Sequence, residues 1–231
     1  LLTSTPEGWR LAPTRFRFAG GEASLSGLFG TRTEIDARLQ AMPLSVLDIA
    51  YPELGLGGIA SGVLRYRWPA GGAPPAGEAN LRILGLTRAG LVLSSRPVDI
   101  GLNARLDGVN AAMRAVAVSD GRTIGRAQAR ISPIGGSGTL AERLARAPMR
   151  AQIRYNGAAD TLWRLTGIEL IDLSGPAAIG ADLSGTFENP TINGSVRTAG
   201  ARLESAVTGM VIENLQSVGR FGGSRLQVQS F

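Results

Sequence analysis

The sequence predicts a mostly β chain that folds as an elongated, curved antiparallel sheet, a β-taco or half-pipe groove, with a few short helices. Apolar and polar residues alternate strictly over most of the chain, with the period of two expected for strands. Turn signals rich in Gly, Asn and Asp separate these runs. Large rings are scarce, since only 5% of residues are aromatic although 44% are hydrophobic. Leu, Ile, Val and Ala therefore line strand faces that contact something thin rather than a deep core.

The alternating runs divide each strand into an apolar and a polar side. The clearest cover residues 33–40, 98–107, 149–156 and 179–188, and shorter ones at 15–18, 64–68 and 225–229 continue the pattern to both ends. We expect the apolar sides to form one continuous concave surface, because side chains two apart share a face. The candidate lining residues are Ile35, Leu39, Ile100, Leu102, Leu106, Met149, Ile153, Tyr155, Ile179, Leu183, Phe187, Ile192 and Val196.

Short turns connect the runs. Residues 19–21, 106–108, 119–121 and 188–190 carry the Gly, Asp, Asn and Pro that tight corners need. Strand units of about 8 to 14 residues favour a meander of antiparallel strands over βαβ units, which require helical crossovers.

Three segments at 42–50, 138–146 and 159–167 break the alternation and are predicted to be short helices. Pro43 suits a first helical turn, and Thr139 is predicted to cap the second helix with Glu142 three residues later. Asp160 is the predicted N-cap of the third.

The stretches near 69–78 and 135–138 are rich in Gly, Pro and Ala or Ser and are predicted to be flexible surface loops. Alternation resumes on both sides of each. We therefore interpret residues 1–231 as part of a single groove domain, with a domain break at the first loop as the alternative.

The residue inventory argues against an enzyme. With no His and no Cys, the usual general base, the thiol nucleophile and most metal sites are missing, and no cofactor or metal is predicted. Carboxylates alternate with apolar residues, as a solvated strand face requires. These carboxylates are Asp36, Asp99, Asp107, Asp182 and Glu188.

The net charge of +6 comes only from Arg, and these residues are spread along the chain rather than clustered in a basic stripe with interleaved aromatics, so no nucleic-acid partner is predicted. Attraction to anionic lipid head groups remains open. The sequence contains neither a signal region nor about 20 consecutive apolar residues, so we expect any membrane anchor to lie outside this fragment.

Several motifs resemble the TamB family of translocation and assembly module proteins. The most recognisable is Gly-Thr-Phe-Glu-Asn-Pro-x-Ile-x-Gly-x-Val at 185–196, preceded by 160–165 and 172–176 and followed by 200–204 and 209–215. Upstream, 42–44 and 54–58 are similar to a helix-then-strand segment of the family. AsmA-like relatives, which share the architecture, carry similar motifs.

The resemblance implies a periplasmic groove anchored in the bacterial inner membrane, with an outer-membrane partner of the TamA/BamA type. It implies phospholipid transport between the two membranes in support of outer-membrane biogenesis. The alternative within the family is a scaffold for outer-membrane protein and autotransporter assembly and secretion. Physical reasoning supports the lipid, because an uncovered apolar face needs an occupant. An acyl chain of about 16 carbons gains roughly 12 kcal/mol when fully buried.

Three other interpretations remain open. A β-sandwich or β-helix would pack its apolar faces on each other and show a closed core. A protein-binding scaffold would accept an added strand at a sheet edge. A passenger or barrel segment is disfavoured by the interspersed helices and the missing aromatic girdles.

Overall fold

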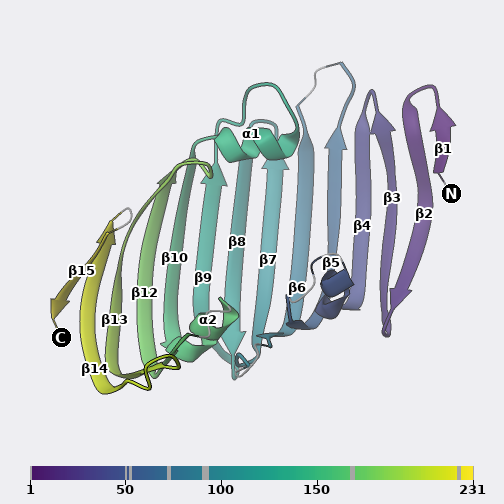
Figure 1. Cartoon of the computed structure of the whole chain (residues 1–231). Coiled ribbons are helices and arrows are strands. Elements are labelled where there is room, and N and C mark those ends of the chain that lie inside the picture. The colour runs from purple at the N-terminus through teal and green to yellow at the C-terminus, as the bar shows by residue number, and fades with distance from the viewer. Residues whose placement is uncertain are drawn as a thin grey trace.

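The chain folds into one open antiparallel sheet of fifteen strands, which confirms the predicted fold class (Figure 1). The computed structural model describes residues 2–49, 51, 54–71, 74–89, 94–166, 170–222 and 225–230. Fourteen strands follow one path in sequence order, and β11 pairs with β13 beside that path. The sheet does not close, so neither a barrel nor a sandwich forms within the described residues.

Most strands are ten residues or longer. Along the path they are β1 (Leu2–Thr5), β2 (Gly8–Phe18), β3 (Gly21–Gly30), β4 (Thr33–Pro43), β5 (Leu56–Trp68), β6 (Ala76–Arg88), β7 (Val98–Asp107), β8 (Asn110–Ser119), β9 (Arg122–Ile131), β10 (Met149–Ala158), β12 (Pro176–Gly185), β13 (Pro190–Ser205), β14 (Val211–Gly222) and β15 (Arg225–Ser230). The short β11 (Ile171–Ser174) precedes β12, and the two lie end to end along β13.

The turns fall where the sequence places them. Ala19 and Asp120 adopt positive φ values of 45° and 50° in the β2–β3 and β8–β9 connections, followed by Gly20 and Gly121. A left-handed residue is what a tight hairpin needs, and Gly adopts it without a steric penalty. β6 begins at Ala76, so the loop after β5 is shorter than predicted, and residues 72–73 within it lie outside the described part. β5 and β6 pair directly, so the sheet continues across this loop.

The three predicted helical segments are helical, with two corrections at their starts. The 3₁₀ helix η1 (Leu44–Ile49) begins just after Pro43, which ends β4. α1 (Leu140–Arg146) has the predicted capping box, in which the Thr139 hydroxyl accepts from the Glu142 backbone N–H. For α2 (Ala159–Leu165) the predicted N-cap, Asp160, is wrong: Ala158 is the N-cap, and Asp160 lies inside the first turn.

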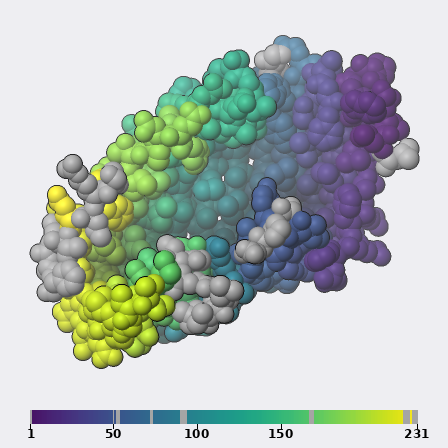
Figure 2. Space-filling view, viewed as in Figure 1, coloured from purple at the N-terminus to yellow at the C-terminus, as the bar shows by residue number. Residues whose placement is uncertain are grey.

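All three helices lie at the ends of the strands and form two rims. α1 runs along one end of the strands, whereas α2 and η1 lie at the other (Figure 1). α1 contacts the apolar side, because the Arg143 guanidinium lies 5.3 Å from the centre of the Trp68 ring. Between the rims the molecule is hollowed into a trough (Figure 2).

The buried apolar residues lie mostly at the rims, and in the middle of the sheet Ala181 on β12 is buried as well. Ile134, beside α1, has no exposed surface, and Met149 and Tyr155 at the two ends of β10 are also buried. The accessible surface is 14410 Å². A compact monomer of 24.0 kDa would expose only about 9,900 Å². The excess is what a single layer with an uncovered face requires.

Candidate functional site

The candidate site is the apolar face of the sheet, the trough floor, and the strand register fixes its composition. Residues directly opposite each other on antiparallel strands share a face. Starting at Ile35 on β4, the pairs lead through Tyr66 and Gly77 to Leu106 on β7. They continue through Ala111 and Ile131 to Met149 on β10. One row of side chains therefore crosses seven strands without changing face.

Two further rows run parallel to the first and complete the middle of the floor. One contains Ala37, Leu64, Ala79, Ala104, Met113, Ala129, Ala151, Leu183 and Ile192. The other contains Leu39, Gly62, Leu81, Leu102, Ala115, Ala127, Ile153, Ala181 and Gly194. None of these positions carries a charged or hydrogen-bonding side chain, so the floor is continuously apolar from β4 to β13.

Twelve of the thirteen sequence-predicted lining residues lie on this face. Besides those in the three rows, Ile100, Tyr155, Ile179 and Val196 form part of a fourth row nearer to α2. Phe187 does not belong to the floor. β12 ends at Gly185, which has a φ of 92°, and Phe187 lies in the following turn, where it is 55% exposed. The prediction that the alternation of β12 extends to Phe187 is therefore wrong.

The depth of the floor varies along the trough. On β8 and β9 the floor side chains are small, chiefly Ala111, Ala115, Ala127 and Ala129. The neighbouring strands carry larger ones, such as Leu102 on β7 and Ile153 on β10, and Ile153 is 41% exposed. A bulky occupant would find the most room over β8 and β9.

The first rim borders the trough along the strand ends, from β5 to the β12–β13 turn. α1 contacts Trp68 through Arg143, whose Nη2 also donates to the Ile134 carbonyl over 3.2 Å. At its other end the Ala145 carbonyl accepts from the Phe187 backbone N–H over 3.1 Å. Burial raises the pKa of the Tyr66 hydroxyl, which the nearby Arg143 charge partly opposes.

The second rim is held by ion pairs that sequence reasoning missed. Arg96 Nε lies 2.8 Å from Oδ2 of Asp160, whose side chain is only 5% exposed. Arg164 pairs with Asp172 over 2.9 Å. Arg88 of β6 donates to the Leu165 carbonyl over 3.3 Å. The partners of Arg96 and Arg88 lie 64 and 77 residues away in the sequence, so no local pattern indicates them.

Tyr155 connects the second rim to the floor. Its hydroxyl donates to the Ala158 carbonyl. Burial is the main reason that the pKa of Tyr155 is raised, a hydrogen bond with Thr161 opposes the shift, and the Asp160 charge adds to it. The hydroxyl is therefore neutral at ordinary pH and adds no charge to the trough.

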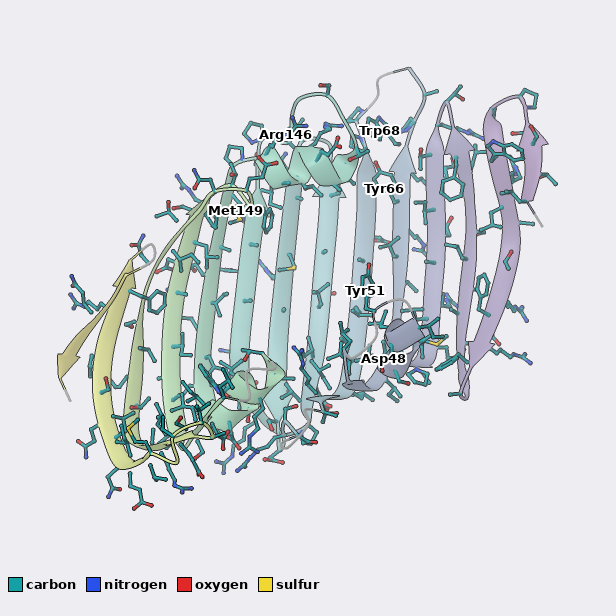
Figure 3. The ribbon with its side chains drawn as sticks, in the orientation of Figure 1. Asp48, Tyr51, Tyr66, Trp68, Arg146 and Met149 are labelled. Atoms are coloured by element: carbon teal, nitrogen blue, oxygen red, sulfur yellow. The ribbon has the colours of Figure 1, made fainter. Side chains whose placement is uncertain are left out.

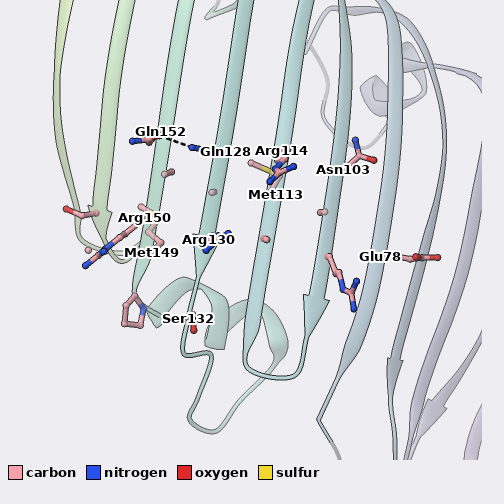
Figure 4. A pocket seen from close by; sticks show the side chains of 18 of the residues that line it. Glu78, Asn103, Met113, Arg114, Gln128, Arg130, Ser132, Met149, Arg150 and Gln152 are labelled. Atoms are coloured by element: carbon pink, nitrogen blue, oxygen red, sulfur yellow. Dashed lines mark hydrogen bonds between the residues drawn. The ribbon is translucent and has the colours of Figure 1, made fainter.

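The opposite face of the sheet is polar and solvated. Gln128 donates to Gln152 across β9 and β10 over 2.8 Å, beside a shallow depression of about 1170 Å³ (Figure 4). Asp36 and Asp182 lie within 3.7 and 2.9 Å of arginine nitrogens on neighbouring strands. Among the described residues, no group of three or more potential ligands is placed to hold a metal ion.

Several aromatic and acidic side chains lie at the two rims of the trough. Figure 3 shows Tyr66 and Trp68 near α1, and at the other end of the strands it shows Asp48 in η1 and Tyr51 close to it. The Asp48 carboxylate accepts from the Gly55 N–H over 3.2 Å and thereby fixes the chain as it enters β5.

Comparisons with family models, curated proteins and solved structures find no match to this chain. No helix in the described part of the chain is both long and apolar enough to cross a membrane.

Proposed function

We propose that the apolar trough holds the acyl chains of phospholipids and lets them move between the inner and outer membranes of a bacterium. In this proposal the protein lies in the periplasm, is anchored in the inner membrane by a segment outside this chain, and supports outer-membrane biogenesis. Its partners are phospholipid and an outer-membrane protein of the TamA/BamA type. It has no catalytic role.

The observation that carries the proposal is the continuous apolar floor, which no second layer covers in the described part of the chain. Floor residues such as Leu102, Ala104 and Met113 are only half buried. An apolar patch of this extent on a soluble protein marks an interaction site. A lipid is the occupant that fits best, because acyl chains need no hydrogen-bond partners and the side chains of the two middle rows offer none.

The dimensions suit lipid chains. With adjacent strands about 4.8 Å apart, the fourteen strands of the path span roughly 62 Å, and the continuous floor from β4 to β13 takes up about 38 Å of this length. Ten-residue strands give an arc of about 34 Å between the rims, wide enough for several acyl chains side by side. The trough alone is too short to connect two membranes, so it would form one section of a longer conduit.

Lipid extraction followed by mass spectrometry of the purified protein tests this proposal. We expect phospholipid to copurify at one or more molecules per chain and to be lost when floor residues are made charged. Protein free of lipid after purification without detergent, and unable to take lipid from vesicles, would reject the proposal.

The second candidate function, a scaffold for outer-membrane protein assembly, rests on the open edges of the sheet. β1 and β15 each pair on one side only, so their free backbone groups can accept an added strand. A scaffold would bind an extended peptide with an affinity that is insensitive to charges on the floor.

A further inference from the structure

The polar face carries an unusual concentration of positive charge on three neighbouring strands. β8, β9 and β10 contain six Arg and no Asp or Glu. Five of these arginines, here called the arginine face, are exposed and point away from the trough, as the register shows. They are Arg114, Arg126, Arg130, Arg150 and Arg154.

The arginine face places like charges opposite each other. Arg130 pairs directly with Arg150, and Arg126 pairs directly with Arg154, across the same two strands. Directly opposed like charges destabilise a sheet. Of the five side chains, only Arg154 has a carboxylate within ion-pair distance among the described residues, namely Asp182 at 2.9 Å.

The same face near the N-terminal edge has a different arrangement. There Arg15 and Arg17 both approach Glu22, at 3.8 and 3.2 Å. Arg65 lies between Asp36 and Glu78, at 3.7 and 2.8 Å. Carboxylates are therefore interspersed with the arginines of β2–β6, whereas β8–β10 contribute none, so the net positive charge per strand is higher over β8–β10 than over β2–β6 and an anionic partner would be drawn there.

The spacing of the opposed arginine pairs limits the kinds of anion that can bind to both. The two opposed pairs are four residues apart along the strands, or about 14 Å, and the Gln128–Gln152 hydrogen bond lies between them. The depression of about 1170 Å³ extends this surface to Asn80 and Asn103, and to Glu78, whose carboxylate is paired with Arg65 at 2.8 Å. A ligand that fits has anionic groups separated by neutral, hydrogen-bonding stretches.

Other partner classes fit less well. The arginine face covers roughly 14 Å by 14 Å, far below the about 800 Å² per partner of a stable protein interface. β8–β10 are interior strands, so no backbone edge is free to pair with a peptide. The side chains that line the depression include no aromatic ring on which a nucleobase could stack. Few apolar side chains face outward there to enter a bilayer.

We propose that the arginine face binds a carboxylated polysaccharide strand, with the opposed Arg130 and Arg150 holding one carboxylate, Arg126 contacting a second, and the amides between them contacting sugar hydroxyls. This site lies on the face opposite the trough and does not depend on lipid binding. It would hold the sheet against an anionic glycan while the trough remains free.

The test measures binding of the purified protein to polygalacturonate, with neutral dextran as the reference polymer, at low and high salt. We expect salt-sensitive binding to polygalacturonate only. The double variant R130Q/R150Q should bind about tenfold more weakly, because each exposed guanidinium–carboxylate contact contributes a few-fold in affinity. The matched control R15Q/R17Q removes the same charge from arginines on the same face that already have a carboxylate partner, and should stay close to wild type.

Binding is also measured to polyglutamate and to phosphatidylglycerol vesicles, which present other kinds of anionic group. Weaker binding to both than to polygalacturonate supports the proposal. Equal losses in the two double variants, wild-type binding by R130Q/R150Q, or a stronger Arg130-dependent affinity for polyglutamate or vesicles would overturn it. Ile153→Asp, on the trough floor, should bind polygalacturonate normally, so failure of the lipid proposal and failure of this one give different results.

Discussion

A charge placed on the trough floor should block lipid binding without unfolding the protein, and Ile153→Asp is the sharpest such change. Ile153 lies on β10 between Ala127 and Ala181 and is 41% exposed. In the empty trough the new carboxylate therefore keeps contact with water. The folded state loses only part of one apolar side chain, about 1 kcal/mol.

The cost appears when acyl chains cover the site. A carboxylate in hydrocarbon costs roughly 2.5 to 3.5 kcal/mol on membrane-insertion scales. No cationic side chain in the rows around Ile153 can compensate it. Because 1.4 kcal/mol corresponds to a factor of ten, we expect the affinity for a fluorescent phospholipid to fall about a hundredfold. Leu183→Asp, in the next row, should behave alike.

The matched control is Gln152→Glu, which adds the same charge one residue away on the opposite face. A glutamate there still accepts the hydrogen bond that Gln128 donates over 2.8 Å, so lipid affinity should stay within about twofold. Asp182→Asn is a second control, which loses only an exposed ion pair with Arg154. Equal losses from Ile153→Asp and Gln152→Glu, or full lipid affinity of a folded Ile153→Asp protein, would refute the reasoning.

Three predictions concern the rims. Arg96→Ala leaves the buried Asp160 carboxylate without its ion-pair partner, so urea denaturation should show that the free energy of unfolding falls by about 1 to 2 kcal/mol. This is less than for a fully buried ion pair, because the Arg96 side chain is largely exposed. Thr139→Ala removes the capping box, and hydrogen exchange should report α1 destabilised by about 1 kcal/mol with the sheet unchanged. Burial raises the pKa of Tyr155 in the folded state, so the neutral hydroxyl contributes stability that is fully present below the unfolded pKa of 10.0 and is lost as pH rises through the folded pKa. The melting temperature should therefore fall above pH 10.0, and it should fall less in Tyr155→Phe.

The faces of the strands were predictable because they depend on a local rule. A strand shifted by one residue would turn every side chain to the wrong face, so the alternation around Leu102 or Ile153 determines where each side chain lies. The local rule fails where the backbone leaves the strand. Gly185, with its φ of 92°, ends β12 and carries Phe187 into a turn that periodicity does not indicate.

Nonlocal features could not be predicted in this way. Asp160 has the residue type of an N-cap, but Arg96, 64 residues earlier, binds its carboxylate instead. Alternation is equally compatible with a sandwich and with an open sheet, because it does not say what covers the apolar face. The absence of a second layer over the described floor became visible only in three dimensions. The opposed arginines were also hidden, since Arg130 and Arg150 belong to separate runs that only the register brings together.

The most direct test of the account is photocrosslinking from single positions on the two faces of β10. A photoreactive residue at position 153 faces the trough, and one at position 152 faces outward beside Gln128. In cells or with lipid vesicles, we expect covalent phospholipid adducts from position 153 and none above background from position 152. Equal adducts from both positions, or none from position 153 in a folded protein, would contradict the claim that the trough carries lipid.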